Sequence, residues 1–342
     1  MNTAPAPDSP ATGTVLTAAG TGLTAAGTVL TLTLNPAVDM CWDVGHLADI
    51  GKNRARVRSV TGGGGGINVA RGVTRLGGRA VAVHTAGREV GRRLCRLLDE
   101  EGLDHIAVEI AGETREALVL LETESGRSHH IVPPGPHLDD HEGRRCLDVL
   151  VKAIGACRYV VASGSLPSGL PDDFYAAVAR QVRAAGARLV LDTSGPALRH
   201  GLAEGVYLLR CNRAEAADLI GRDVTGFDDA RAVNEHLLTT GAVEVAVTAI
   251  DDLGALCSTR HGHTELRAPP PPGQLVSDAG AGDSMVAALA TRLSAGDDPV
   301  SACALGVAVA AASVLTPGTE PFDREVAESL RRNIRTTFHA AP

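Results

Sequence analysis

Hydrophobic and polar positions along the chain follow two alternating patterns. Short runs rich in Val, Leu and Thr predict β-strands at 28–34, 159–162, 188–192 and 243–248. Segments rich in Ala, Leu and Arg with helical spacing lie beside them, at 172–186, 213–221 and 227–240. Strands that alternate with helices form a parallel sheet covered by helices on both faces. We therefore predict an α/β fold with a mainly parallel central sheet.

Two segments depart from this alternation, at about 40–61 and about 104–133. Each contains consecutive short strand patterns with no helix between them, such as 54–58, where charged and apolar side chains alternate. This pattern predicts a small second sheet that stands off the main domain. The last third of the chain returns to helical spacing, at 281–295, 299–315 and 323–336.

Composition and charge exclude several classes of protein. Of the 342 residues 44% are hydrophobic and 21% are charged, which is enough apolar surface for one large folded domain. Aromatic residues make up only 2%, the net charge is −8 and no basic run occurs, so we expect no nucleic-acid partner. No apolar run reaches the length of a membrane span, so we expect no membrane partner.

The first residues and the cysteines bear on location. Residues 1–27 are rich in Ala, Thr, Gly and Pro and lack the basic start and apolar middle of a signal peptide, so we expect a disordered tail. The seven cysteines are scattered with no CxxC pair, which is typical of reduced thiols. These features predict a cytoplasmic protein with its folded domain at 28–338.

Five consecutive glycines, Gly62–Gly66, come directly before a helical pattern that begins near Ile67. Such a run can be a flexible linker. Alternatively, glycines at a helix N-terminus let the backbone approach a ligand, and the N–H groups there favour anions and hydroxyls. The spacing matches neither GxGxxG nor GxxxxGK[ST], which excludes the Rossmann and Walker phosphate loops.

A second glycine turn, Gly280-Ala281-Gly282, precedes Asp283 at the start of another predicted helix. Phosphoryl transfer needs N–H donors around the moving group and a carboxylate that takes the proton of the acceptor hydroxyl. The alternative is an Asp N-cap behind a glycine turn, which is a common way to begin a helix.

Asn212 and Glu215 follow a predicted strand at 206–210 and lie one helical turn apart. Open α/β sheets bind ligands at the carboxyl ends of their strands. The pair can therefore hold Mg²⁺ through water, or it can be an N-cap with its capping-box Glu. The second role does not exclude the first.

Together these features resemble the ribokinase-like (PfkB-type) sugar kinases, from about Thr28 to about Arg335. Thr31–Asp39 resembles the opening motif of the sugar-phosphate kinases in that family, and Gly112–Arg115 and Ser163–Gly169 are typical of the same branch. The resemblance implies a ribokinase-like three-layer αβα sandwich with a small β-sheet lid. It also implies a homodimer that pairs through the lid.

Within this family the chain is similar to the minor-isozyme 6-phosphofructokinases, which convert fructose 6-phosphate and MgATP to fructose 1,6-bisphosphate. The 1-phosphofructokinases and tagatose-6-phosphate kinases usually carry a Lys in the first glycine loop, where this chain has only glycine. Lys52, Pro134-Gly135 and Asp192–Gly195 favour the same branch. The two other kinases remain the alternatives.

The resemblance further implies the roles of individual residues. Asp283 would be the general base, and the N–H groups of Gly280, Ala281 and Gly282 would form the anion hole. The implied sugar-phosphate ligands are Asp39, Gly64, Gly65, Asn68, Arg115, Ser165, Lys52 and His130. The implied nucleotide ligands are Arg210, Asn212, Glu215, Thr248, Gly254, Val307 and Ala311.

Two cations are implied as well. Mg²⁺ would be held through water by Asn212 and Glu215, next to the phosphates of ATP. A monovalent cation such as K⁺ would bind beside the anion hole, near Ser277, Ala279, Ser313 and Gly318.

Several positions depart from the family pattern. The family's Lys-Pro-Asn is Arg210-Cys211-Asn212 here, and Arg is bulkier and less adaptable than Lys at a phosphate. The nucleotide loop Thr248–Gly254 carries Asp251 and Asp252, whose charges would repel polyphosphate. The usual Asp-Thr-(Thr/Val) ahead of the anion hole is Ser277-Asp278-Ala279.

A further departure lies on the sugar side. A second basic phosphate contact falls at His129-His130, which would bind phosphate mainly when protonated, or these histidines are exposed lid residues and Arg115 suffices. The departures leave two other functions open. One is a non-catalytic sugar-phosphate or nucleotide-binding protein on the same fold, and the other is a kinase for a different phosphorylated sugar or a nucleoside.

Overall fold

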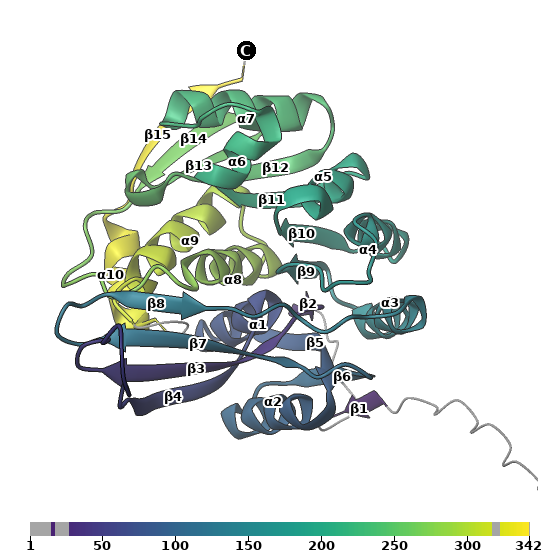
Figure 1. Cartoon of the computed structure of the whole chain (residues 1–342). Coiled ribbons are helices and arrows are strands. Elements are labelled where there is room, and N and C mark those ends of the chain that lie inside the picture. The colour runs from purple at the N-terminus through teal and green to yellow at the C-terminus, as the bar shows by residue number, and fades with distance from the viewer. Residues whose placement is uncertain (1–14, 18–26, 317–321, 342) are drawn as a thin grey trace, which may run out of the picture.

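The computed structural model describes residues 15–17, 27–316 and 322–341. In this part of the chain the centre is one eleven-stranded sheet with helices against both faces (Figure 1). In spatial order its strands are β1 (Val15–Thr17), β6 (His105–Ile110), β5 (Arg79–Gly87), β2 (Thr28–Thr33), β9 (Tyr159–Ser163), β10 (Arg188–Asp192), β11 (Val206–Asn212), β12 (Val243–Ala249), β13 (Ala255–Thr259), β14 (Gly262–Arg267) and β15 (Arg335–Ala340).

The strands from β6 to β12 run parallel to their neighbours, whereas β1 and β13 to β15 are antiparallel additions at the two edges. One face of the sheet is covered by α1 (Gly65–Arg75), α2 (Arg88–Glu101), α8 (Ala281–Ser294) and α9 (Pro299–Ser313), with α10 (Arg324–Arg332) packed on α9. The other face is covered by α3 (Asp140–Ile154), α4 (Phe174–Ala184), α5 (Gly195–Ala203), α6 (Arg213–Ile220) and α7 (Phe227–Thr239).

Small side chains allow the helices of the first face to pack closely. A Cβ at Gly72 in α1 would lie 2.6 Å from the Ala287 Cβ in α8, so these two helices touch along their backbones. Gly306 in α9 likewise accommodates Met285 of α8. Close packing of α1 on α8 matters for function, because each helix begins directly after one of the two glycine loops. The two loops are therefore held side by side.

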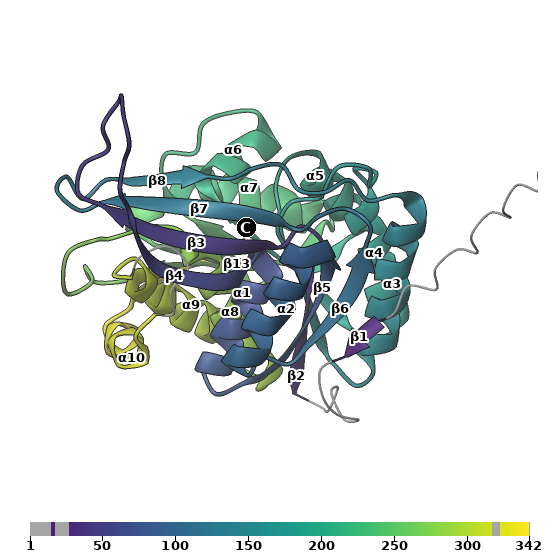
Figure 2. The same ribbon diagram turned by 60° about the horizontal axis from the view of Figure 1, so that its bottom comes forward.

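A second, four-stranded sheet lies over the carboxyl ends of the central strands (Figure 2). It consists of β4 (Arg56–Gly63), β3 (Ala37–Val44), β7 (Arg115–Glu122) and β8 (Ser128–Ile131), in this spatial order. Strand β3 pairs in parallel with β7 and antiparallel with β4. We call this sheet the lid. Its last strand before the first glycine loop, β4, leads directly into α1.

The predicted α/β fold, with a mainly parallel central sheet and a smaller sheet, is confirmed. One strand of the segment 104–133 was assigned to the wrong sheet, because β6 pairs with β5 in the main sheet. The segment 281–336 is not all helical either: α10 ends at Arg332 and β15 follows it. Strand β15 pairs with the edge strand β14, which lies about 70 residues earlier, and local sequence patterns do not reveal such a contact.

The expected tail at 1–27 contains one element of structure. Residues 15–17 form β1, which pairs antiparallel with the edge strand β6, so the prediction of disorder is wrong for these residues. The rest of that segment, 1–14 and 18–26, lies outside the described residues. Across the described ranges, no helix is both long enough and apolar enough to span a lipid bilayer.

Candidate active site

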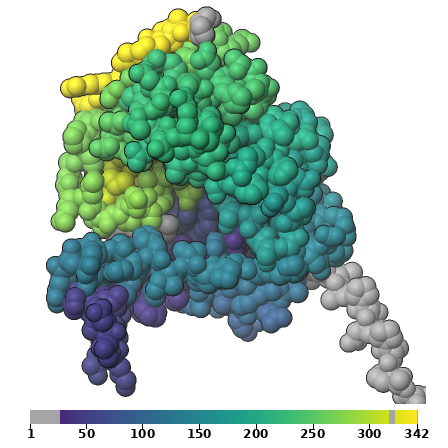
Figure 3. All heavy atoms as spheres, turned by 45° about the horizontal axis from the view of Figure 1, so that its top comes forward, coloured from purple at the N-terminus to yellow at the C-terminus, as the bar shows by residue number. Residues whose placement is uncertain are grey.

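Two adjoining cavities lie at the carboxyl ends of the central strands, in the recess visible in Figure 3, and residues of the lid line the first of them. The first, the lid cavity, has about 220 Å³, and its lining includes Asp39, Gly64, Asn68, Arg115, His130 and Ala279. The second, the helix cavity, has about 320 Å³ at the N-terminus of α8, and its lining includes Gly65, Ser163, Asp192, Arg210, Glu215 and Asp283.

The first glycine loop is a packed part of the site and not a linker. Gly64 has a φ of +114°, which disfavours other residues, and it begins α1. A Cβ at Gly63 would overlap the Asp39 carboxylate, and one at Gly65 would overlap the Ser163 hydroxyl. Glycine is thus needed here so that the backbone can lie against two polar groups of the cavities. This excludes the linker interpretation.

The second glycine loop begins α8. Gly280 has a φ of +77° and is the N-cap of the helix, with no side-chain cap, and Ser284 N donates to its carbonyl at 2.9 Å. Asp283 lies in the first turn of α8, so the interpretation of Asp283 as an N-cap is wrong. Its carboxylate instead faces the helix cavity, beside the first N–H groups of the helix.

Asp283 receives hydrogen bonds from two other elements. Asn68 Nδ2 in α1 donates to its Oδ2 at 2.9 Å, and Ser163 Oγ at the end of β9 donates to its Oδ1 at 3.3 Å. Burial, together with the nearby Asp192 carboxylate, raises the pKa of Asp283 to about 7, although Asn68, Arg210 and Ser163 oppose the shift. A carboxyl group with a pKa near neutrality is suited to accept and return a proton.

Arg210, at the end of β11, lies between Asp192 and the α8 loop. Its Nη1 is 3.5 Å from Asp192 Oδ1, and a Cβ at Gly282 would lie 2.7 Å from the same nitrogen. No described group bonds its buried Nε. Burial works against the charge, but Asp192, Glu215 and other nearby groups raise the pKa of Arg210. The guanidinium is therefore charged and borders the predicted anion hole.

Asn212 and Glu215 form a capping box at the start of α6. Glu215 N donates to Asn212 Oδ1 at 2.9 Å, and Asn212 N donates to Glu215 Oε2 at 2.8 Å. The Glu215 carboxylate also lines the helix cavity, and burial raises its pKa. The structural interpretation of this pair is thus confirmed, and Glu215 still reaches the cavity.

In the lid cavity Arg115 is half-buried. Its Nη2 donates to Asn35 O at 2.9 Å and its Nη1 to Pro133 O at 3.2 Å, while no described group bonds its buried Nε. Burial lowers the pKa of Arg115, although Asp39 opposes the shift. These bonds hold the Arg115 guanidinium near the Asp39 carboxylate. The pair suits a ligand with both phosphate and hydroxyl groups, because the cation can bind the phosphate and the carboxylate can accept from the hydroxyls.

The other predicted sugar ligands lie in different places. His130 on β8 lines the lid cavity, and its Nε2 is 3.1 Å from Ser128 Oγ. Ser165 lines the helix cavity instead, where its Oγ accepts a hydrogen bond from Asn35 Nδ2 at 3.1 Å. Lys52 is exposed in the loop between β3 and β4 and lines neither cavity, so this conformation does not bring it to the site.

Five of the predicted nucleotide residues lie outside both cavities: Asn212, Thr248, Gly254, Val307 and Ala311. The Thr248 side chain is fully buried and donates to Asn234 Oδ1 at 2.6 Å, so its hydroxyl is not presented to a ligand. Gly254 has a φ of +114°, and a Cβ there would overlap a backbone carbonyl of β14, which gives this glycine a structural role. Val307 is buried in the core and Ala311 is partly buried, both on α9.

The predicted monovalent-cation residues are partly brought together. Ser277 N donates to Val314 O at 3.3 Å, which holds the segment before the anion hole against the end of α9. Ser313 is buried next to this contact, and Ala279 lines the lid cavity. Gly318 lies outside the described residues.

The acidic nucleotide loop carries less uncompensated charge than its sequence suggests. Arg213, at the start of α6, forms an ion pair of 2.9 Å with Asp251. One of the two acidic groups expected to repel polyphosphate is therefore paired. Because both partners are about half exposed, solvent screens this pair.

Sequence reasoning assigned no role to Ser163, Asp192 or Asn35, although all three contribute to the site. Ser163 and Asp192 are the last residues of β9 and β10, and Ser163 Oγ lies 3.2 Å from Asp192 Oδ2. The signal that could have found them is a polar residue at the carboxyl end of a parallel strand, where open sheets bind ligands.

Comparisons with known proteins agree with this arrangement. The profile described as pfkB family carbohydrate kinase matches residues 32–325. The chain is 38% identical over 298 residues to ATP-dependent 6-phosphofructokinase isozyme 2 of Mycobacterium tuberculosis, which covers 87% of each chain. It is 33% identical to the protein of that name in Escherichia coli, over 84% of this chain and 93% of the relative. It is 32% identical to 1-phosphofructokinase of Bacillus subtilis, over 86% and 96%.

Solved structures of sugar kinases have the same fold as this chain. A crystal structure of phosphofructokinase-2 from Escherichia coli in complex with potassium superposes with a TM-score of 0.84 and 31% identity, covering 89% of this chain and 98% of that chain. Ribokinase from Giardia lamblia, at 17% identity, shares the fold with a TM-score of 0.70, over 90% of this chain and 100% of that chain.

Proposed function

Because the chain belongs to the pfkB family of carbohydrate kinases, we propose that it transfers the γ-phosphoryl group of ATP to fructose 6-phosphate and forms fructose 1,6-bisphosphate. The observation that carries the proposal is Asp283, a carboxyl group with a pKa of about 7 where the lid cavity meets the helix cavity. Asp283 lies between Arg115, which lines the lid cavity, and Arg210, which lines the helix cavity. One cation for each cavity fits transfer of a phosphoryl group between two phosphorylated substrates.

In this mechanism the sugar lies in the lid cavity and the ATP phosphates lie in the helix cavity. Asp283 accepts the proton of the acceptor hydroxyl, whose oxygen forms a bond to the γ-phosphorus while the bond to the β–γ bridging oxygen breaks. ADP carries away the electron pair of that bond. Backbone N–H groups at the start of α8 and the Arg210 guanidinium stabilise the negative charge of the moving group.

Phosphate recognition on the sugar side rests on Arg115. Its guanidinium is already oriented by two backbone carbonyls, so little side-chain entropy is lost when it binds an anion. Asp39 would accept hydrogen bonds from sugar hydroxyls on the same side. His130 lines the same cavity and would add a second contact when protonated.

The helix cavity fits a magnesium ion bound with the nucleotide. Besides Asp283, the carboxylates of Asp192 and Glu215 line it, and hydrated Mg²⁺ prefers a few carboxylate oxygens together with substrate phosphates. When bound, Mg²⁺ neutralises charge on the phosphate oxygens. For K⁺, the contact of the 276–279 segment with the end of α9 supports a site there, and the potassium complex of the Escherichia coli relative supports the same ion.

The relatives leave 1-phosphofructokinase as the second candidate, since the Bacillus subtilis relative carries that name. The all-glycine loop favours the 6-phosphofructokinase branch. A non-catalytic binding protein is disfavoured, because a protein that only binds has no need for a carboxyl group with a neutral pKa at the junction of two cavities.

ATP turnover, followed by coupled ADP release with Mg²⁺ and K⁺, tests the proposal. The acceptors are fructose 6-phosphate, fructose 1-phosphate, tagatose 6-phosphate, fructose and adenosine. We expect the highest kcat/KM with fructose 6-phosphate. A preference for fructose 1-phosphate or tagatose 6-phosphate would reassign the branch, and no turnover of any acceptor by protein that binds a sugar phosphate would favour the binding protein.

Two accompanying properties belong to the proposal. A homodimer that pairs through the lid is supported by three apolar side chains of the lid region that are more than half exposed, Val57, Ile131 and Val132. A cytoplasmic location is supported by the seven cysteines, which are all free thiols.

A further inference from the structure

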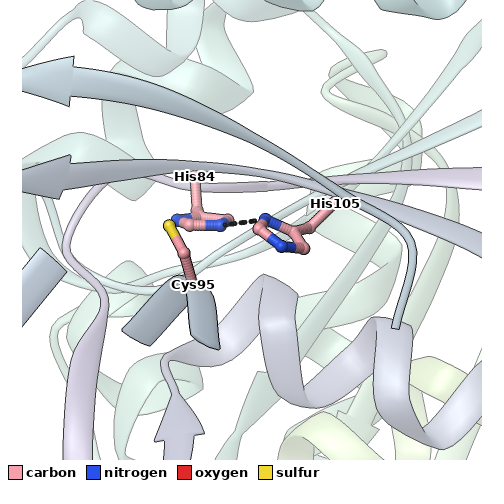
Figure 4. Close-up of side chains that lie close together, drawn as sticks. All are labelled: His84, Cys95 and His105. Carbon is pink, nitrogen blue, oxygen red and sulfur yellow. Dashed lines mark hydrogen bonds between the residues drawn. The ribbon is translucent and has the colours of Figure 1, made fainter. Parts of the chain in front are cut away.

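Two histidines and a cysteine gather where α2 covers the main sheet (Figure 4). His84 comes from β5, His105 from the neighbouring strand β6, and Cys95 from α2. Both histidines are buried, whereas Cys95 is partly exposed. None of the three lines the lid cavity or the helix cavity, so the proposed kinase chemistry does not account for them.

The distances within this cluster are close to those around a tetrahedral metal ion. His84 Nε2 and His105 Nδ1 are 3.0 Å apart, and one donor atom from each of the three residues lies within 4.8 Å of the other two. Zinc–nitrogen bonds of about 2.0–2.1 Å at the tetrahedral angle separate two ligand nitrogens by about 3.3 Å. A small movement of the rings would therefore admit the ion.

The outer nitrogens of both rings already have the partners that metal-bound histidines use. His84 Nδ1 lies 2.9 Å from Thr85 O, and His105 Nε2 lies 3.2 Å from Asp99 Oδ1. Histidines that bind metals usually donate their other ring N–H to a backbone carbonyl or a carboxylate, as both can do here. With those two tautomers, both inner nitrogens present lone pairs to each other.

The number of protons on the two imidazole rings also favours a cation between them. The three contacts of the chain Thr85 O, His84, His105, Asp99 each need one ring proton, but two neutral imidazoles supply only two. When neutral rings satisfy both outer contacts, the facing nitrogens have no proton between them, and their 3.0 Å contact then needs either a third proton on the pair or another cation. A cation in that place, with Cys95 Sγ as a third ligand, satisfies every nitrogen.

We propose that His84 Nε2, His105 Nδ1 and Cys95 Sγ form a binding site for Zn²⁺ that links α2 to strands β5 and β6. A nitrogen and thiolate donor set suits zinc, and its fourth position would hold water from the partly exposed Cys95 side. The Cys95 thiol loses one proton to solvent on binding. The charges of Zn²⁺, the thiolate and the Asp99 carboxylate then sum to zero.

The test uses the full chain without an affinity tag, freed of metal by a chelator. Titration with Co²⁺ should give a sulfur-to-cobalt charge-transfer absorption and the visible bands of tetrahedral cobalt, saturating at one equivalent, and Zn²⁺ should remove both. Cys95→Ser should abolish the charge-transfer band. Cys157→Ser, a matched control at a buried cysteine outside the cluster, should retain it.

Two further measurements keep the proposal testable if Cys95→Ser folds poorly. Asp99→Asn should weaken Co²⁺ affinity by about 10–100-fold, because Asp99 orients and polarises His105. Zn²⁺ should raise the thermal midpoint of the wild type but not of His105→Ala. The proposal is overturned if the wild type shows no charge-transfer band, if the band survives in Cys95→Ser, or if Asp99→Asn binds Co²⁺ as the wild type does.

Discussion

Asn68 Nδ2 donates a hydrogen bond of 2.9 Å to Asp283 Oδ2, across 215 positions of sequence. This bond joins the first turns of α1 and α8, and with them the two glycine loops. It also connects the two cavities, since Asn68 lines one and Asp283 lines the other. The proposed base is thus oriented by a residue that lines the lid cavity.

Asp283→Asn should lower kcat by at least about 10²-fold, because an amide cannot accept the hydroxyl proton, and this is the low end of general-base contributions. Sugar-phosphate binding should be retained. The coupled ADP assay measures the loss. Asp278→Asn is the matched control, since this exposed carboxyl lies in the segment just before α8 and lines neither cavity. A near-wild-type kcat in Asp283→Asn would remove the base assignment.

The rate should depend on the ionisation of Asp283. Because the environment raises its pKa to about 7, kcat/KM should rise with pH through neutrality and level off above it. Arg210 lowers the pKa of Asp283, so the acid limb of Arg210→Gln should move to higher pH. Arg213→Gln, which removes a cation paired with Asp251 instead, should leave the limb in place. If the acid limb of the pH profile is unchanged in Arg210→Gln, Arg210 does not lower the pKa of Asp283.

Asp283→Asn should also stabilise the fold above neutral pH. The carboxyl ionises at about pH 4 in the unfolded chain but at about 7 in the folded one, so folding disfavours its charge. This destabilisation is complete above about pH 7, shrinks as the pH falls, and vanishes below about pH 4. The thermal midpoint of the variant should exceed that of the wild type at high pH only. A difference independent of pH would argue against the raised pKa.

Arg115→Ala should raise the KM for fructose 6-phosphate by about 10–100-fold, the equivalent of one charge-assisted hydrogen bond. The KM for ATP should change little, since Arg115 lines only the lid cavity. Arg93→Ala, which removes a partly exposed guanidinium paired with Glu116, is the control. Because Arg115 also bonds two backbone carbonyls, melting curves should accompany the kinetics. An unchanged KM for the phosphorylated sugar would indicate a neutral acceptor.

Gly65→Ala should abolish most of the activity. A Cβ at this position would overlap the Ser163 hydroxyl, which holds the Asp283 carboxylate. Gly226→Ala is the control, because a Cβ there meets no atom within 4 Å and the backbone is extended. Steady-state kinetics of both variants make the comparison. Equal activity of the two would mean that the first glycine loop tolerates a side chain.

The sequence by itself determined the class of fold and much of the site. Apolar strand runs separated by amphipathic helical segments require a parallel sheet covered on both faces, and glycines at helix starts mark places where the backbone lies against other groups. Such local signals, together with the family resemblance, were enough to assign Asp283, Asn68 and Arg115 to the site. These features depend on neighbours within about one helical turn, which is why pattern reasoning finds them.

The tertiary structure alone decided which of these residues meet. Only the packing of α1 on α8 brings Asn68 to Asp283. Only the order of strands in the sheet brings Ser163, Asp192 and Arg210 together, at the carboxyl ends of three adjacent strands. The strand β15 at the sheet edge and the cluster of His84, Cys95 and His105 also arise from contacts between segments distant in sequence. Local periodicity carries no information on such contacts, because it depends only on residues a few positions apart. The burial and the charge that shift the pKa of Asp283 likewise come from residues far along the chain.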